Sequence, residues 1–592
     1  MFRTSLALAA ILLAGCSATA PMPDARSFIE KAEADLLELG VAESRATWIQ
    51  STHITDDTEA LAAAATEKRI KAAVEYAKQA AKYDAAKEPP DVARKLVILK
   101  RSLVIATPAD PKEAAELTRI NSKMESTYGK GKHCRDASKP ETCRDIQQLS
   151  AVLAKSTNPK ELLEAWTGWH TISPPIRPDY VRHVDLANKG ARELGYADTG
   201  AMWRSNYDMP PEVFAKEVDR LWEQVKPLYT SLHSYVRRKL NQRYGDGVVP
   251  RDGPIPAHLL GNMWAQSWDN LYPMLAPPNA DPGFDLSKII QSRKMDPRAM
   301  VKAGEEFYLS LGFQPLPDTF WTRSLFTKPR DREVVCHASA WDVDQVDDLR
   351  IKMCIEPTGE DLYTIYHELG HNYYQRAYNK QPYLFRDSAN DGFHEAIGDT
   401  VQLSVTPDYL VKKGFLARAP DPSRDTGVLL QRALEKVAFL PFGIMIDQWR
   451  WKVFSGEVKP ENYNKAWWEL RASYQGVAPP TERTEGNFDP GAKYHVPASY
   501  PYTRYFIAHL LQFQFHRALA QKAGCDLSKT PLHRCSIYGS KEAGKAFADM
   551  LAMGSSKPWP EALEALTGKR ELDATAIMDY FAPLKTWLDA QK

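Results

Sequence analysis

The stretch at residues 362–377 reads LYTIYHELGHNYYQRA and carries apolar residues at helical spacing. Within it, His367 and His371 stand four residues apart, so a helix presents both imidazoles on one face, where they can bind one metal ion. Glu368 lies beside them and can take a proton from a water at that ion. This HExxH pattern predicts a zinc hydrolase, although a chance occurrence is the alternative for the motif alone.

A third candidate ligand follows this helix. Glu395 lies 24 residues after His371, inside the hexapeptide HEAIGD that begins at His394. Two histidines and one glutamate leave a coordination position open for water, as a catalytic zinc site requires. Asp399 comes one helical turn after Glu395 and could accept the free ring N–H of a ligating histidine. A solvated helix carboxylate is the other interpretation of Asp399.

The overall composition narrows the class of protein. The chain has 592 residues, of which 44% are hydrophobic and 26% are charged, and its formal net charge is +1. These values are typical of a globular protein and argue against disorder and against a surface that binds a polyanion. We therefore expect no nucleic-acid partner.

The N-terminus is typical of an exported lipoprotein. Arg3 precedes an apolar run at residues 6–13, and Ala-Gly-Cys follows, ending at Cys16. We expect residues 1–15 to be a signal peptide, Cys16 to carry a lipid, and residues 16–28 to form a lipidated tether. An ordinary cleaved signal with an incidental cysteine is the alternative. No later stretch has the roughly 18 consecutive apolar residues of a membrane-spanning helix, so the lipid is the only expected membrane attachment.

The six cysteines beyond Cys16 form three pairs that are close in sequence. In an exported chain, such pairs favour disulfide bonds made in an oxidising compartment. Six unrelated thiols are the alternative, because sequence alone does not establish connectivity. The expected pairs are Cys134/Cys143, Cys336/Cys354 and Cys525/Cys535.

Most of the remaining sequence predicts helices. Residues 25–156 are rich in Ala, Lys, Glu and Leu, which favour helix. Apolar residues at helical spacing recur along the chain between proline-rich turns. The clearest stretches are residues 59–82, 89–105, 211–242, 362–377, 429–453, 498–523 and 542–553.

One small hairpin is expected in this helical chain. Residues 332–340 and 348–355 favour strands and are joined by a polar stretch. Cys336 and Cys354 could staple the two strands together. No internal repeat, low-complexity linker or charge block divides the sequence, so we expect one catalytic unit at residues 29–592.

A second group of polar residues occupies residues 493–505. Lys493, His495, Tyr502 and Tyr505 could hold a substrate and stabilise an oxyanion, which peptide hydrolysis also requires. Neighbours in sequence need not converge on one site, so the residues alone leave a structural role equally open.

Taken together, these motifs resemble those of angiotensin-converting enzyme and its bacterial relatives. The likeness is collinear and runs from about residue 30 to the C-terminus. Its motifs are GNMWAQ from residue 261, VCHASAWD from 335, HELGH from 367, GFHEAIGD from 392, DQWRW from 447 and KYHVPASYPYTRY from 493.

The resemblance implies a mainly α fold, with one large helical domain, a deep central cleft and a small β-hairpin near the zinc. It also implies a zinc metallopeptidase of the peptidyl-dipeptidase type, which removes dipeptides from the C-termini of oligopeptides. The residues implied in catalysis are His367, His371 and Glu395 as zinc ligands, Glu368 as general base and later proton donor to the leaving amine, and His495 and Tyr505 as donors to the oxyanion.

The resemblance further implies a set of residues that hold the substrate. A clamp fixed relative to the zinc lets only the bond two residues from the C-terminus reach the metal. The carboxypeptidase branch of the family carries a longer, charged Arg where this chain has Gln266, so Gln266 favours dipeptide release. The implied contacts are Gln266, Lys493 and Tyr502 on the terminal carboxylate, His337 and the backbone of Ala338 along the peptide, and Phe439 and Phe442 around the final side chain.

Two departures from the family pattern fall on side-chain pockets. His509 stands where the mammalian enzymes have a Phe, so the pocket for the final residue is expected to be more polar. Tyr500 replaces a small residue near the pocket before the cut, so the preference there is expected to differ as well.

Two activating chloride ions are also implied by the resemblance. Trp467 and Arg471 match part of the first site, but His170 stands where the family has an Arg. An unperturbed histidine titrates at about 6.5, so this site is expected to bind chloride weakly at neutral pH and better in acid. Tyr207 and Arg504 match the second site, which is expected to be intact.

We therefore expect a monomer, anchored by lipid on the periplasmic or cell-surface side of a bacterial membrane, that acts on oligopeptides with a free C-terminus. Another zinc peptidase, such as an aminopeptidase or an oligoendopeptidase, is disfavoured because the likeness extends well beyond the HExxH helix. A catalytically silent surface-binding protein would be signalled by loss of Glu368 or of a zinc ligand, and all of these are present.

Overall fold

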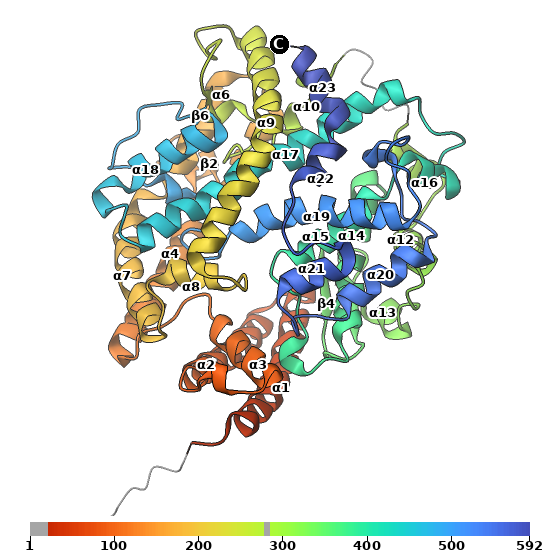
Figure 1. Cartoon of the computed structure of the whole chain (residues 1–592). Helices are drawn as coiled ribbons and strands as arrows, with labels where there is room; N and C mark the ends of the chain where they lie inside the picture. Colours follow the sequence, from red (N-terminus) through yellow and green to blue (C-terminus); the bar gives the residue numbers. More distant parts are fainter. Residues whose placement is uncertain (1–21, 278–283, 592) are drawn as a thin grey trace, which may run out of the picture.

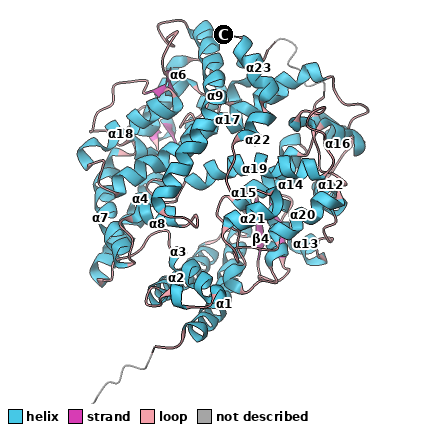
Figure 2. Cartoon of the chain, in the orientation of Figure 1, coloured by secondary structure: helices cyan, strands magenta, loops and turns pink. Residues whose placement is uncertain are grey.

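Helices make up most of the described chain (Figure 2). The computed structural model describes residues 22–277 and 284–591. The expected signal peptide at residues 1–15 and the expected lipid attachment at Cys16 lie outside the described residues. Within them, strands occur only as three two-stranded sheets. The prediction of a mainly α fold is therefore confirmed.

The helices of the N-terminal half of the chain are α1 (Ala25–Thr52), α2 (Asp56–Ala80), α3 (Pro90–Arg101), α4 (Pro111–Gly129), α5 (Ile146–Lys155), α6 (Pro159–His170), α7 (Arg177–Glu193), α8 (Thr199–Ser205), α9 (Pro211–Tyr244), α10 (Tyr272–Leu275) and α11 (Leu286–Ser292). Those of the C-terminal half are α12 (Pro297–Leu311), α13 (Asp318–Arg323), α14 (Gly359–Tyr378), α15 (Phe393–Leu403), α16 (Pro407–Lys412), α17 (Asp425–Phe454), α18 (Tyr463–Leu470), α19 (Thr503–Lys522), α20 (Lys541–Leu551), α21 (Trp559–Thr567), α22 (Thr575–Tyr580) and α23 (Ala582–Ala590). The strands are β1 (His133–Cys134), β2 (Cys143–Arg144), β3 (Ile255–Pro256), β4 (Ser339–Asp342), β5 (Leu349–Lys352) and β6 (Val477–Ala478).

Every stretch predicted to be helical contains a helix, and the largest boundary error is at α19. We expected this helix to begin at residue 498, but it begins at Thr503. A turn precedes it, in which Ser499 has a positive φ of 57° and the Tyr500 N–H donates to the His495 carbonyl. Pro501 then disfavours helical backbone at the residue before it, so the helix does not extend back through Tyr500.

The predicted hairpin is present, but its first strand is shorter and starts later than expected. β4 pairs with β5 in antiparallel register, Ser339 opposite Lys352. Residues 332–338 lie outside the strand. Lys352 Nζ, from the partner strand, donates to the Val335 and His337 carbonyls at 2.7 Å each, so a side chain rather than a strand ladder holds this segment.

The three N-terminal helices form a subsidiary unit at the bottom of Figure 1. Buried residues of α1, α2 and α3, such as Phe28 and Leu96, pack into an apolar cluster separate from the main core. α1 starts at Ala25, where Asp24 caps it by accepting the Ser27 N–H at 3.0 Å. The expected boundary between tether and catalytic domain, at residues 28 and 29, therefore falls inside a helix.

Asp208 connects this unit to the body of the protein. Arg94 and Arg101 of α3 both form ion pairs with its carboxylate. The Trp559 N–H, at the start of α21, donates to the same carboxylate at 3.2 Å. One buried carboxylate thus joins α3 to a helix more than 300 residues away in the sequence.

Close contact between α14 and α15 brings the HExxH helix against the helix of Glu395. A Cβ added at Gly370 would lie 2.7 Å from the Gly398 Cα, and one added at Gly398 would lie 2.7 Å from His367 Nδ1. Both distances are shorter than packed atoms tolerate. Glycine at these two positions therefore lets the helices approach closely enough to share a ligand set.

All three predicted disulfides are present: Cys134–Cys143, Cys336–Cys354 and Cys525–Cys535. Cys134 and Cys143 are directly opposite each other in the β1–β2 pair. Three disulfides indicate a protein that matures in an oxidising, extracytoplasmic compartment. Among the described helices, none combines the length and the apolar character needed to cross a membrane.

Candidate functional site

The three expected zinc ligands meet between α14 and α15. Nε2 of His371 lies 3.0 Å from Nε2 of His367, which in turn lies 3.6 Å from Glu395 Oε2. One donor atom from each residue lies within 4.8 Å of the others. Two imidazole nitrogens and one carboxylate oxygen form the donor set of a catalytic zinc site, so these residues fit zinc.

The charges at this site favour a cation. Burial opposes the charged form of His367, but hydrogen bonds to Asp399 and Glu395 raise its pKa to about 10. Burial and the charge on His367 instead lower the pKa of His371 to about 3. Although burial opposes the ionised form of Glu395, the two histidines lower its pKa to about 2. The site thus stabilises added positive charge, which a divalent metal ion supplies.

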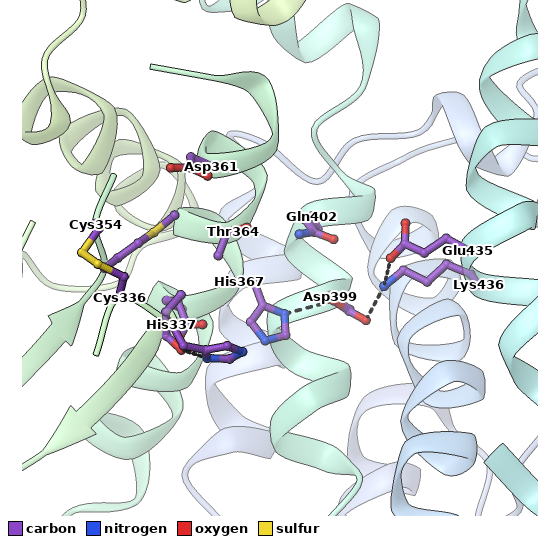
Figure 3. A pocket seen from close by; sticks show the side chains of 13 residues that line it. Cys336, His337, Cys354, Asp361, Thr364, His367, Asp399, Gln402, Glu435 and Lys436 are labelled. Carbon is purple, nitrogen blue, oxygen red and sulfur yellow. Dashed lines mark hydrogen bonds and ion pairs between the residues drawn. A yellow bond between two sulfur atoms is a disulfide. The ribbon is translucent and has the colours of Figure 1, made fainter. Parts of the chain in front are cut away.

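Asp399 lies behind His367, as expected, and has a second partner that the sequence did not indicate (Figure 3). Its Oδ1 lies 3.0 Å from His367 Nδ1, and its Oδ2 lies 3.0 Å from Lys436 Nζ on α17. Burial opposes ionisation of Asp399, but Lys436 and His367 lower its pKa. The carboxylate therefore stays charged and holds the His367 ring in place.

Behind His371 lies a different partner. Its Nδ1 is 3.1 Å from Nδ1 of His394, and His394 Nε2 is 3.1 Å from the Tyr378 hydroxyl. The sequence did not indicate these contacts, because His394 directly precedes a ligand and its place in that motif already accounts for it. The two histidine ligands are thus held by unlike groups, a carboxylate for His367 and an imidazole for His371.

Glu368 borders two adjoining cavities. One, of about 440 Å³, is lined by the Cys336–Cys354 disulfide and by polar side chains of α14 and α17 (Figure 3). The other, of about 410 Å³, is lined by β4 residues and by Glu395. His337, Ala338, His367 and Glu368 line both cavities. Burial raises the pKa of Glu368, which suits a group that accepts and returns a proton.

The expected oxyanion donors come together at the start of α19. The rings of His495 and Tyr505 are 5.8 Å apart between centroids. Burial, reinforced by the charge of Lys493, lowers the pKa of His495 to about 2, and burial raises the pKa of Tyr505. Both side chains are therefore neutral hydrogen-bond donors at neutral pH. Asp447 fixes this segment by accepting the Tyr502 and Thr503 N–H groups at 2.7 Å each.

The expected carboxylate clamp is also assembled. Gln266 Oε1 accepts from Lys493 Nζ at 3.2 Å and from the Tyr502 hydroxyl at 3.0 Å. Lys493 Nζ also lies over the Trp264 ring, 4.1 Å from its centroid. Burial lowers the pKa of Lys493 to about 7, and no charged neighbour in the described part of the chain offsets that burial.

Aromatic side chains surround the clamp. Phe439 and Phe442 both lie against the Tyr502 ring, at 5.9 and 5.7 Å between centroids. His509 stacks on Phe439 at 4.4 Å, and its Nδ1 is bonded to the Tyr505 carbonyl at 2.8 Å. Tyr500 is 47% exposed and lies beside the Tyr494 ring, 6.1 Å between centroids.

The residues of the first expected chloride site are all buried. Trp467 Nε1 and Arg471 Nη1 have no acceptor among the described residues. His170 stacks on Trp166 at 3.7 Å, and its Nδ1 is bonded to the Trp166 carbonyl at 2.8 Å. Burial lowers the pKa of His170 to about 4. Its protonation therefore requires much stronger acid than we expected from the unperturbed residue.

The second expected chloride site contains a carboxylate that the sequence did not indicate. Arg504 Nε lies 3.1 Å from Asp391 Oδ2. Burial, followed by the charge of Asp391, raises the pKa of Tyr207, which hydrogen-bonds the same carboxylate. Asp391 is 113 residues before Arg504 in the sequence, and only the fold brings them together. An anion at this site would have to compete with Asp391 for Arg504.

Comparison with known proteins gives one family along almost the whole chain. Residues 20–592 match the family model described as angiotensin-converting enzyme. The chain is 43% identical over 570 residues to angiotensin-converting enzyme of Bos taurus, an alignment that covers 95% of this chain and 43% of that protein. The chain thus spans less than half the length of this relative.

Two shorter relatives align over most of their own length. Angiotensin-converting enzyme of Theromyzon tessulatum is 45% identical over 482 residues, covering 81% of this chain and 77% of that protein. Angiotensin-converting enzyme of Haematobia irritans exigua is 38% identical over 576 residues, covering 96% of this chain and 94% of that protein.

Proposed function

Because the chain belongs to the angiotensin-converting enzyme family, we propose that it is a zinc-dependent peptidyl-dipeptidase that releases dipeptides from the C-termini of oligopeptides. The observation that carries this proposal is the buried ammonium of Lys493, which lies beside Gln266 with no carboxylate to pair with it among the described residues. A buried cation is stabilised by an anion, and the terminal carboxylate of a peptide supplies one.

The proposed chemistry divides into an acid–base part and an electrostatic part. Zinc, when bound, polarises the scissile carbonyl and lowers the pKa of a water. Glu368 takes the proton of the attacking water and later delivers it to the leaving amine. His495 and Tyr505 donate hydrogen bonds to the oxyanion as its charge develops.

The position of the cut follows from the connection between clamp and oxyanion donors. Lys493 and Tyr502 of the clamp alternate in sequence with His495 and Tyr505, and Asp447 fixes the backbone between them. A rigid connection sets the distance between the substrate's C-terminus and the bond that is cut. Gln266 stands where the carboxypeptidase branch has a longer and charged Arg. Its shorter amide supports a distance of two residues between the bond that is cut and the substrate's C-terminus.

Mass spectrometry of the products tests this proposal. The substrates are a set of peptides, each with a free and with an amidated C-terminus. We expect dipeptides from the free acids and much slower cleavage of the amides. Release of single residues would indicate a carboxypeptidase, and internal cuts at equal rates would indicate an endopeptidase. No products from the zinc-loaded protein would indicate a catalytically silent binding protein.

We also propose chloride as an activating ion, bound at the two expected sites. Trp467 Nε1 and Arg471 Nη1 are buried donors with no acceptor in the described part of the chain, which supports an anion between them. At the second site, Asp391 already supplies a negative charge to Arg504. Arg504 Nε nevertheless makes no hydrogen bond in the described part of the chain, so we propose an anion there as well, in competition with Asp391.

Finally, we propose that the protein is exported and attached by a lipid on Cys16 to the bacterial cell envelope. The three disulfides support an oxidising compartment. Cys16→Ser should move the protein from the membrane to the soluble fraction with its peptidase activity intact. Unchanged membrane fractionation would contradict the lipid anchor.

We further propose a monomer, which is compatible with zinc ligands and a clamp that are complete within one chain. Light scattering of the purified protein measures the mass of the particle directly. A dimer with full activity would contradict this part of the proposal.

A further inference from the structure

His371 contacts a second imidazole on the side away from the other ligands. Its Nε2 faces Nε2 of His367 at 3.0 Å, whereas its Nδ1 lies 3.1 Å from Nδ1 of His394. His394 Nε2 lies 3.1 Å from the Tyr378 hydroxyl. Three side chains of α14 and α15 therefore form one continuous hydrogen-bonded chain that leads away from the ligand cluster.

Hydrogen-bond chemistry gives this chain a direction. A neutral imidazole has one N–H donor and one acceptor nitrogen. If His371 offers the Nε2 lone pair to a metal, its hydrogen is on Nδ1 and is donated to His394 Nδ1. His394 then carries its own hydrogen on Nε2 and donates it to the Tyr378 oxygen. Each residue thereby determines the tautomer of the one before it.

We infer that His394 is a positioning residue, which holds His371 in the tautomer and ring orientation that present Nε2 to zinc, and that Tyr378 holds His394 in the same way. This inference rests on the zinc site of the proposed function. Loss of such an outer partner commonly weakens metal binding by about 10- to 100-fold. The effect here should be comparable, because an imidazole acceptor is the only partner that His371 Nδ1 has among the described residues.

His394 packs on two tyrosine rings and also borders the cavity of about 410 Å³. Its ring packs against Tyr374 at 4.6 Å and Tyr378 at 6.0 Å between centroids. Burial, together with the negative charge of Asp387, raises the pKa of Tyr378, so this side chain remains a phenol. The hydroxyl of Tyr374 instead accepts the Ala389 N–H at 3.1 Å and takes no part in the chain. Tyr374 is thus a matched control for Tyr378.

Zinc affinity of the full chain, measured by competition with a chromophoric chelator, tests the inference. His394→Phe removes both ring nitrogens but keeps an aromatic ring against Tyr374. We expect it to weaken zinc binding by about 10- to 100-fold. His394→Asn returns an acceptor near the position of Nδ1 and should recover part of the loss. Circular dichroism of the metal-free variants checks that each is folded.

The pair Tyr378→Phe and Tyr374→Phe removes the same hydroxyl from two rings that pack on His394. We expect Tyr378→Phe to weaken zinc binding several-fold and to change the visible absorption spectrum of the Co²⁺-substituted protein, while Tyr374→Phe leaves both as in the wild type. If His394→Phe does not fold, this pair of variants still tests whether the hydrogen-bonded chain through His394 supports zinc binding.

Two results would overturn the inference. One is a folded His394→Phe variant that binds zinc as tightly as the wild type. The other is a Tyr378→Phe variant with the same zinc affinity and the same Co²⁺ spectrum as Tyr374→Phe. Failure of the proposed function looks different, because the wild-type chain would then bind no zinc at all, and the positioning role would fall with it.

Discussion

The metal-binding region and the carboxylate-binding region differ in how their charges are paired. Around His367 and His371, the chain supplies its own partners, and the Asp399 carboxylate is paired with Lys436. Around Lys493, it supplies hydrogen-bond acceptors and aromatic rings but no negative charge in the described residues. The first region is organised before a peptide arrives, whereas in the proposed function the second obtains its counter-charge from the peptide.

This difference allows the chemical step and the binding of the peptide to be tested separately. Changes in the metal-binding region should remove the chemistry for every substrate, because all peptides use the same groups. Changes in the carboxylate-binding region should alter which peptides bind, because we propose that Lys493 interacts with one end of the substrate. The two kinds of effect can be measured independently, as kcat for the first and as discrimination between peptides for the second.

The largest effect is expected in the metal-binding region, for Glu368→Gln. This change removes the base without removing a ligand, so kcat should fall by about 10³ to 10⁴ while zinc stays bound. Glu395→Ala should instead lose zinc as well as activity. Metal analysis of both purified variants, alongside product formation, separates the two roles. Substantial turnover by zinc-loaded Glu368→Gln would show that another group is the base.

A smaller effect is expected from removing the charge of the clamp. Charge-assisted hydrogen bonds of this kind are worth ~1.5 to 3 kcal/mol. Amidation of the substrate should therefore slow cleavage by about 10- to 100-fold at low substrate concentration. Lys493→Ala should remove most of that difference between acid and amide. Lys452→Ala, which changes a lysine paired with Glu457, is the control and should keep the full difference.

A still smaller effect is expected from pH. Burial lowers the pKa of Lys493 to about 7, so the free enzyme holds a charged Lys493 below that pH and a neutral one above it. Because the carboxylate binds the charged form, KM for free-acid peptides should rise above pH 7, by up to about tenfold per pH unit.

The arginine variant checks the cause of this pH dependence. An Arg stays charged throughout, so Lys493→Arg should flatten the rise in KM, whatever its effect on the absolute rate. A wild-type KM that is constant from about pH 6 to about pH 9 would argue against a lysine that titrates near neutrality.

The smallest effect is expected from chloride. Since Asp391 already pairs with Arg504, chloride at the second site should change wild-type activity only a few-fold, about 1 kcal/mol or less. Asp391→Asn removes the competing charge and should increase the response, and adding Arg504→Gln should abolish the increase. Chloride titration of activity at constant ionic strength measures each case. The competition is contradicted if Asp391→Asn responds to chloride as the wild type does and adding Arg504→Gln changes nothing further.

The sequence predicted well those parts of the molecule whose cause is local. Helical spacing identified the helices, and paired cysteines identified the disulfides, because both depend on residues close together in the chain. It failed at the first strand of the hairpin, where residues 332–338 are β-rich but lie outside the ladder. Val335 bonds instead to the Ser51 carbonyl of α1, a partner too distant in sequence to be predicted.

The candidate site shows the same difference between features with a local cause and contacts between residues distant in sequence. Residues carried over from family motifs converge as expected, among them Gln266, Lys493 and Tyr502. Groups that support them were missed, namely Lys436 behind Asp399 and Asp391 beside Arg504. Each of these contacts crosses between two elements, and a single sequence carries no periodic signal for such a contact. His394 was missed for another reason, since its neighbour Glu395 already explained the motif.

The three disulfides connect cysteines that are 9, 18 and 10 residues apart. Short loops close more readily than long ones, so the native pairing is also the set that random encounters in an unfolded chain reach first. In a chain exported as proposed, each partner leaves the export channel soon after the other. Oxidation in order of emergence therefore yields the correct bonds, and the chain can mature without a thiol–disulfide isomerase to rearrange them.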